Sequence, residues 1–276
     1  MTIEGLCGCA GVTKQAFYKA RKARQQKEID EELVLALVRR VRHFHPRMGT
    51  RKLLVVLGRE LEEAGVSIGR NKLFALLRKH NLLIKRKRRS VRTTDSRHRF
   101  AVYPNALREA AISAPHQALV TDLTYIRTEK GFVFAVFVMD AYSRKIVGYN
   151  VAASLEASGC LRATEQALAQ LPAGARPIHH SDRGTQYCCA DYIDLLKQYG
   201  VTISMTEENH CYENGKAERL NGIMKQEYGL GGTLADLAEV RRLVEQAVWL
   251  YNTGRPHTKL GYTTPQEVHE RASAAA

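Results

Sequence analysis

Residues 119–127 read LVTDLTYIR, and they place a carboxylate, Asp122, inside a predicted β-strand. Apolar and β-branched residues recur through this stretch, as is typical of strands. An unpaired carboxylate is costly to bury, so its position inside a strand indicates a chemical role. The pattern continues outward with a hairpin turn at residues 129–131, a buried central strand at 132–139 and a third strand at 146–151. We expect these three consecutive strands to be antiparallel.

The later elements alternate between helices and strands. The sequence predicts a helix over about residues 155–171, a fourth strand over 178–182, a helix over 192–199 and a fifth strand over 201–205. A helix that bears Glu218 follows. Three strands, helix, strand, helix, strand, helix is the order of a ribonuclease H-like α/β fold, in which helices flank a five-stranded mixed sheet.

Two further carboxylates belong with Asp122. Asp182 ends the fourth predicted strand, and Glu218 lies near the start of a helix whose expected N-cap is Asn214. In the predicted fold the first and fourth strands are neighbours, so the two aspartates meet and their repulsion demands a cation. Oxygen ligands of this kind can hold two hard divalent cations in enzymes that transfer phosphoryl groups. Each residue alone reads equally well as a turn former or a solvated helix residue, but together they indicate an enzyme that cuts and joins DNA. Lys225 shares a helical face with Glu218, which predicts a DNA phosphate contact.

The charge of the chain is unevenly distributed. Residues 1–100 hold 25 Lys and Arg against 9 Asp and Glu, whereas residues 101–276 hold 17 against 19, which gives the net charge of +14. Such a basic region is suited to binding a polyanion, although a single basic run is as often a solvated face.

The basic region divides into three expected parts. Residues 1–28 predict a basic helical segment, which fits a small helix-turn-helix and a plain basic amphipathic helix equally well. Residues 29–84 predict three helices, at about 30–44, 50–63 and 69–80, which favour a helix-turn-helix DNA-binding domain over a generic bundle. Its expected DNA contacts are Arg70 and Lys72.

Residues 85–114 read as a basic linker, with Lys85, Arg86, Lys87, Arg88 and Arg89 expected along a phosphate backbone. The catalytic core is expected over residues 115–230, and residues 231–276 form its C-terminal helical extension. The six cysteines lack a C-x-x-C pair, the N-terminus lacks a signal-peptide pattern, and the longest apolar run is too short to span a bilayer. We therefore expect a soluble, cytoplasmic protein without a membrane partner.

Four segments in combination resemble one known family. They are TDLTY at 121–125, HSDRGTQY at 180–187, residues 214–227, and YNTGRPH at 251–257 with Thr264 and Pro265. Together they are similar to the catalytic, OrfB-type protein of IS3-family insertion sequences, a branch of the transposases and retroviral integrases with a DDE triad.

The resemblance implies a function in detail. It implies that Asp122, Asp182 and Glu218 bind magnesium or manganese, and that Lys225 contacts DNA. It implies cleavage by water at a 3′ end of terminal inverted repeats, followed by attack of the freed 3′-hydroxyl on target DNA. The motif that contains Arg255 is expected either to contact DNA or to pack the C-terminal helix.

The partners implied are double-stranded DNA in the nucleoid, further copies of the chain on that DNA, and an upstream-frame, OrfA-type protein, because no sustained heptad repeat precedes residue 30. Two alternatives to the transposase remain at this point. One is a non-catalytic DNA-binding regulator that needs the upstream-frame partner for activity. The other is a ribonuclease H-type hydrolase that acts on RNA–DNA hybrids.

Overall fold

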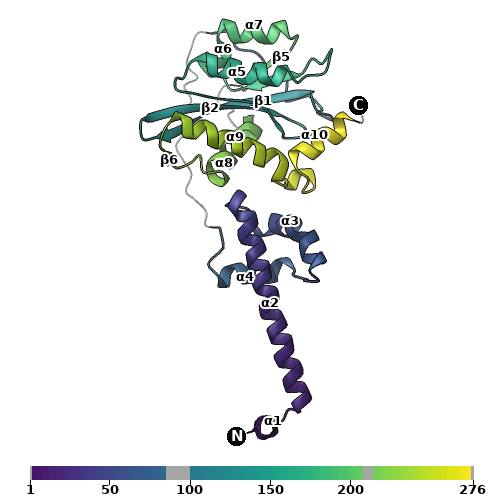
Figure 1. Ribbon diagram of the computed structural model, residues 1–276. Helices are drawn as coiled ribbons and strands as arrows, with labels where there is room; N and C mark the ends of the chain where they lie inside the picture. Colours follow the sequence, from purple (N-terminus) through teal and green to yellow (C-terminus); the bar gives the residue numbers. More distant parts are fainter. Residues whose placement is uncertain (1, 85–99, 208–213, 275–276) are drawn as a thin grey trace. The chain divides into compact units, whose positions relative to one another are not determined.

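The computed structural model describes residues 2–84, 100–207 and 214–274. The chain forms two compact units, residues 1–85 and residues 86–276 (Figure 1). The basic residues that we expect along a phosphate backbone, Lys85 to Arg89, lie outside the described residues.

The first unit is a helical bundle. Its helices are α1 (Ile3–Cys9), α2 (Lys14–Phe44), α3 (Thr50–Glu63) and α4 (Arg70–Lys79). The C-terminal half of α2 packs against α3 and α4 because apolar side chains recur at helical spacing in all three. The buried residues of this core are Val34, Leu35, Val38, Val41, Met48, Leu53, Leu57, Leu61, Leu73, Leu76 and Leu77.

Helix α2 is longer than the apolar pattern predicts. It is continuous from residue 14 to residue 44, so the boundary expected between residues 28 and 29 falls inside a helix. Every side chain from 14 to 29 is exposed, which explains why no apolar periodicity marks this stretch. Charge pairs four residues apart support it, such as Arg24 and Glu28 at 3.2 Å, and no glycine or proline interrupts it.

The second unit is built on a mixed β-sheet. Its strands are β1 (Ala118–Thr128), β2 (Gly131–Asp140), β3 (Ile146–Ala152), β4 (Ile178–Ser181), β5 (Thr202–Met205) and β6 (Thr233–Leu234). The strand order is β3-β2-β1-β4-β5, with β1 to β3 antiparallel and β4 and β5 parallel to β1. This order confirms the predicted ribonuclease H-like α/β fold. The short β6 is an addition: it pairs with β1 at Arg127 and Thr128, beyond the three residues of β1 that β4 pairs.

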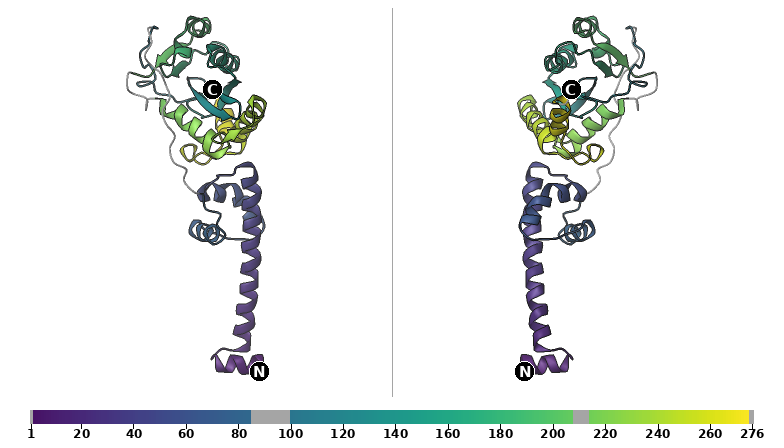
Figure 2. Two further views of the ribbon diagram at one scale, coloured as in Figure 1. Left: turned by 90° about the vertical axis from the view of Figure 1, so that its left-hand side faces the viewer. Right: turned by 90° about the vertical axis from the view of Figure 1, so that its right-hand side faces the viewer.

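Helices cover both faces of this sheet (Figures 1 and 2). They are α5 (Ala157–Leu168), α6 (Thr185–Cys188), α7 (Ala190–Gln198), α8 (Gly215–Glu227), α9 (Leu237–Gly254), the 3₁₀ turn Thr258–Leu260 and α10 (Pro265–Ser273). Alternate side chains of the central strands point to opposite faces. Leu119 and Val138 join the core under α5 and α7, whereas Val120 and Phe137 join the core under α8 and α9.

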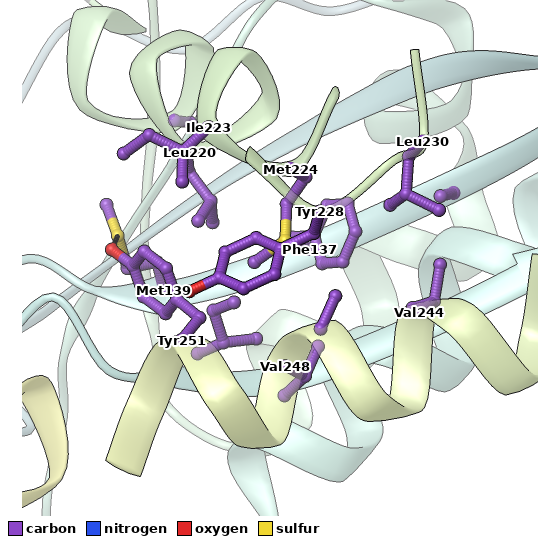
Figure 3. Close-up of a cluster of buried hydrophobic side chains, with 14 of the residues drawn as sticks. Phe137, Met139, Leu220, Ile223, Met224, Tyr228, Leu230, Val244, Val248 and Tyr251 are labelled. Atoms are coloured by element: carbon purple, nitrogen blue, oxygen red, sulfur yellow. Dashed lines mark hydrogen bonds between the residues drawn. The ribbon is translucent and has the colours of Figure 1, made fainter. Parts of the chain in front are cut away.

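The core under α8 and α9 makes α9 part of the sheet unit. Figure 3 shows Phe137 and Met139 of β2 among side chains from both helices. The α8 residues drawn there include Leu220 and Met224, and the α9 residues include Val244, Val248 and Tyr251. All of these side chains are buried. Helices α8 and α9 therefore pack on the same face of the sheet and share this core, so the position of α8 depends on its contacts with the sheet and with α9.

Part of the expected linker packs onto the second unit. Leu107 and Ile112 lie against the core under α8 and α9, and the Leu107 N–H donates to Ser204 Oγ at 3.3 Å. Arg108 pairs with Glu207 at 3.0 Å. Residues 100–114 thus contribute contacts to the sheet unit.

Among the described residues, none of the helices combines the length and the apolar composition that crossing a membrane would require.

Candidate active site

Asp122 lies where β1 loses one of its two neighbours. Strand β2 pairs with β1 along its whole length, with Asp122 opposite Phe137, but β4 pairs only with residues 118–120. The Asp122 side chain is half-buried. Its Oδ1 accepts the Leu123 N–H at 3.0 Å, and its Oδ2 accepts the Asn221 Nδ2–H at 2.9 Å. The carboxylate is thus oriented by two neutral donors.

Asp182 follows β4 directly. The parallel register pairs Ala118 with Ile178 and Val120 with His180, and burial followed by the charge of Asp182 raises the pKa of Asp122, so the two carboxylates are within electrostatic reach of each other. The Gly184 N–H donates to Asp182 Oδ1 at 3.0 Å. A Cβ atom on Gly184 would lie 3.1 Å from that same oxygen, so this turn favours glycine.

Glu218 is exposed in the first turn of α8, and this end of the helix is anchored beside Asp122. The expected N-cap residue, Asn214, is the residue before the helix, but its side chain makes no capping hydrogen bond. Its Nδ2–H donates instead to the Thr121 carbonyl at 2.9 Å. The amide thereby ties the start of α8 to the residue before Asp122.

The three carboxylates interact electrostatically. Burial raises the pKa of Asp122 to about 8, and the charge of Asp182 adds to the rise. The hydrogen bond from Asn221 opposes the rise, while the charge of Glu218 supports it. Asp122 is thus a carboxylate whose ionised form lacks stabilisation, and a cation beside it would supply that stabilisation.

The oxygen atoms of these side chains fit a hard divalent cation, although they do not surround a single metal position in this structure. Among the described residues, no three His, Cys, Asp or Glu side chains stand ready to hold one metal ion. A metal ion shared by the triad would therefore require these side chains to move closer together. Asn221 Oδ1 supports the fit: it is buried, and within the described part of the chain it has no hydrogen-bond partner. Carboxylate and amide oxygens are the ligands that Mg²⁺ and Mn²⁺ prefer.

Lys225 lies near this group. It is half-buried on α8, and burial lowers its pKa while the charge of Asp122 raises it. Its ammonium group is thus within electrostatic reach of Asp122, at the position expected from its spacing to Glu218. The predicted phosphate contact of Lys225 stays a prediction.

Arg255 is placed differently from the DNA contact that we expect from the sequence. Its side chain is only 4% exposed. Its Nε and Nη2 donate to the two carboxylate oxygens of Glu227, each at 2.7 Å, and its Nη1 lies 2.8 Å from His257 Nε2. A guanidinium group engaged in this way presents no free face to DNA. The packing alternative for this motif is the one that the contacts favour.

Arg70 and Lys72 are exposed on α4. The opposite side of α4 is buried, through Leu73, Leu76 and Leu77. The Arg70 Nε–H donates to Asn71 Oδ1 at 3.3 Å, which leaves it at the surface. Their predicted contact with DNA stays a prediction.

Asn221 is the functional candidate that sequence reasoning missed. It follows Glu218 by three residues and precedes Lys225 by four, so helical spacing alone places it on their face. Its contact with Asp122 joins residues 99 apart in sequence. The nearby His179, in contrast, is a core histidine. It is fully buried against Tyr192, and burial followed by the charge of His180 lowers its pKa to about 3.

Comparison with known proteins identifies the family. Two family models described as integrase core domain match residues 112–211 and residues 199–265. The 31 kDa protein of insertion element IS600 from Shigella sonnei is 33% identical over 96% of this chain and 98% of its own length. The chain belongs to the insertion-sequence transposases with an integrase core. The first matched segment contains Asp122 and Asp182, and the second contains Glu218, Lys225 and Arg255.

Two transposases agree with this assignment. The transposase of IS629 from Shigella sonnei is 33% identical over 91% of this chain and 82% of that protein. The IS3A transposase of Escherichia coli strain K12 is 28% identical over 77% and 74%. The resemblance to the IS3 family that the motifs indicated is thereby confirmed.

Proposed function

We propose that this chain is a DNA transposase that cleaves the 3′ ends of an insertion sequence and joins them to target DNA, with Asp122, Asp182 and Glu218 as ligands of two Mg²⁺ or Mn²⁺ ions. The observation that carries the proposal is the parallel pairing of β1 with β4, together with the charge interaction between Asp122 and Asp182. The third carboxylate is on a helix that is tied to the first strand through Asn214 and Asn221.

The chain's own residues prepare the reaction. Two bound divalent ions would supply activation of the attacking oxygen and stabilisation of the leaving oxygen. Asp122 is oriented for this task by Asn221 and the Leu123 N–H, neither of which neutralises its charge. The half-buried Lys225 is placed to bind a phosphate beside the carboxylates.

The first unit supplies DNA recognition in this proposal. Helix α4 follows a short turn after α3 and carries Arg70 and Lys72 on its exposed side. That arrangement suits a recognition helix in the major groove. Lys85 to Arg89 add phosphate contacts through counterion release. Because two DNA ends are joined to one target, the active form is a homo-multimer on DNA, and an upstream-frame protein is its proposed partner.

The test is a cleavage assay on labelled duplexes that carry the inverted repeats flanking this gene, in Mg²⁺ and in Mn²⁺. Wild type is compared with Glu218→Gln and with a matched control, Glu245→Gln, which changes an exposed glutamate of α9. We expect metal-dependent nicking at the 3′ end of the repeat by wild type and by the control. Glu218→Gln should abolish it, because the substitution replaces a charged carboxylate oxygen by a neutral amide oxygen, which binds a divalent cation much less strongly.

Three results would contradict the proposal, in whole or in part. Binding to the repeats without cutting in either metal would indicate the DNA-binding regulator. Degradation of an RNA–DNA hybrid in preference to the repeat duplex would indicate a ribonuclease H-type hydrolase. Equal activity of Glu218→Gln and wild type would remove Glu218 from the site.

A further inference from the structure

Helix α8 carries Glu218, the proposed catalytic glutamate, near its N-terminal end. The C-terminal end of α8 contacts residues from the end of α9 and from the segment that follows α9. Glu227 is the last residue of α8, nine residues after Glu218. Both of its carboxylate oxygens accept hydrogen bonds from Arg255 at 2.7 Å. This bidentate geometry fixes direction as well as distance, which a single ion pair does not.

Two neighbouring side chains support the Arg255–Glu227 pair. His257 Nε2 lies 2.8 Å from Arg255 Nη1, and the Tyr251 ring lies beside both residues, with the guanidinium carbon 5.8 Å from the ring centroid. All three side chains are at least nine-tenths buried. Figure 3 shows Tyr251 entering the same core as the α8 residues Leu220 and Met224.

The same turn of chain also holds the sheet. Asn252 Oδ1 accepts the Ile146 N–H at 2.9 Å, and Asn252 Nδ2 donates to the Ile146 carbonyl at 3.0 Å. The Asn252 side chain thus pairs with the first residue of β3 as a neighbouring strand would. Residues 251–257 therefore join the edge of the sheet to the end of α8.

Besides the apolar packing of α8 and the bond from Lys216 Nζ to the Ala141 carbonyl at 3.0 Å, three side-chain ties hold this helix. Asn214 fixes its start to Thr121, Asn221 fixes its middle to Asp122, and Arg255 fixes its end through Glu227. The first two are single hydrogen bonds from neutral amides, whereas the third is an ionic, bidentate pair. Releasing the end would leave the direction of α8 to its apolar packing and to single hydrogen bonds, which fix it less sharply, and would shift Glu218 relative to the aspartates.

We propose that Arg255 and Glu227 are positioning residues of the active site, which set the orientation of α8 and thereby the reach of Glu218 and Lys225. The inference rests on the proposed function, because it concerns the same carboxylates. It assigns Arg255 a role that acts through α8, with no contact to DNA.

Two substitutions separate this role from its alternatives. Arg255→Lys keeps the positive charge but loses the planar fork that grips both oxygens of Glu227. Glu227→Gln keeps the shape of its partner and removes the charge. The matched control is Arg242→Lys, at an exposed position of α9. For each full-length variant, titration calorimetry gives the Mn²⁺ affinity, and a binding assay gives the dissociation constant of the repeat duplex as a function of salt concentration. A cleavage assay at saturating DNA gives kcat. All three measurements are made well below the melting temperature of the variant protein.

We expect Arg255→Lys and Glu227→Gln to weaken Mn²⁺ affinity and to lower kcat by about tenfold to a hundredfold, because a misplacement of about 1 Å has effects of this size. DNA affinity and its salt dependence should stay within about twofold of wild type, since no phosphate contact is lost. The control should match wild type in all three measurements.

Several outcomes would overturn the inference. A lower melting temperature with unchanged Mn²⁺ affinity and kcat would make the pair merely structural. An Arg255→Gln variant whose salt slope for DNA falls by about 0.9, with kcat unchanged at saturation, would make Arg255 a phosphate contact. If Arg255→Lys does not fold, Glu227→Gln decides the matter by the same readings. Wild type that binds no Mn²⁺ and cuts no DNA would instead refute the proposed function itself.

Discussion

The raised pKa of Asp122 has a consequence for stability that can be tested without DNA. An aspartate that titrates at about 8 in the folded protein and at its ordinary value of 3.8 when unfolded opposes folding wherever the unfolded chain is ionised. The opposing free energy is absent below pH 3.8, grows as the pH rises to about 8, and is constant above that. We therefore expect Asp122→Asn to stabilise the metal-free protein at neutral pH.

The size of the effect follows from the same pKa. At pH 7 about three pH units separate the solution from the ordinary value, and at about 1.4 kcal/mol per unit this gives about 4 kcal/mol. Asparagine has one acceptor oxygen where Asp122 receives two donors, from Leu123 and Asn221, so one hydrogen bond worth about 1 kcal/mol is lost. The net gain of about 3 kcal/mol corresponds to a rise in Tm of about 6–12 °C for the unit of residues 86–276.

The measurement is calorimetric unfolding in EDTA between pH 4.5 and 8.5, for wild type and Asp122→Asn. The difference in Tm should increase with pH and level off near pH 8. Asp194→Asn, at an exposed position of α7, is the matched control and should change stability by about 0.5 kcal/mol or less. A gain that is equal at pH 4.5 and pH 7.5, or no gain at any pH, would refute the reasoning. Excess Mg²⁺ should reduce the difference, because only wild type keeps the full carboxylate set.

Three further predictions follow from single contacts. Gly148→Ala would place a methyl group 2.0 Å from a backbone carbonyl of α5, so it should destabilise the protein by about 3 kcal/mol, measured as a lower Tm; an unchanged Tm would mean that α5 can move aside. Asn221→Ala removes a donor from Asp122 and should weaken Mg²⁺ binding about tenfold in titration calorimetry, whereas equal affinity would show that Asn221 does not orient Asp122. Arg70→Gln and Lys72→Gln should change the order of preference among repeat sequences in a binding-selection assay, and equal losses on all sequences would make both residues phosphate contacts.

The features that sequence alone predicted are local ones. The strand order follows from short periodic segments, each of which carries its own signal. The β1–β4 register needed only that strands 1 and 4 be parallel neighbours, which the order of elements already implied. The IS3-family motifs then fixed the choice among folds with this order.

The features that the sequence did not predict depend on contacts between distant residues. The sequence leaves open whether Arg255 contacts DNA or packs within the protein, and only its contact with Glu227, 28 residues earlier, favours packing. The sequence gives Asn221 no distinctive signal, and its role is suggested only by its hydrogen bond to Asp122. The length of α2 was missed for another reason: residues 14–29 are exposed all round, so the helix has no apolar face to detect there.

The hydrogen-bond donors to Asp122 are neutral, which fits a carboxylate that binds a cation. An arginine or lysine in direct contact would lower the pKa of Asp122 and compete with a metal ion for its oxygens. The donors observed, an amide and a backbone N–H, set the direction of the carboxylate without neutralising it. Arg255 pairs instead with Glu227, where we propose that it orients α8 without neutralising the three carboxylates. In this proposal stability is lost at Asp122 and the geometry is secured elsewhere, which is the distribution that a metal-dependent active site requires.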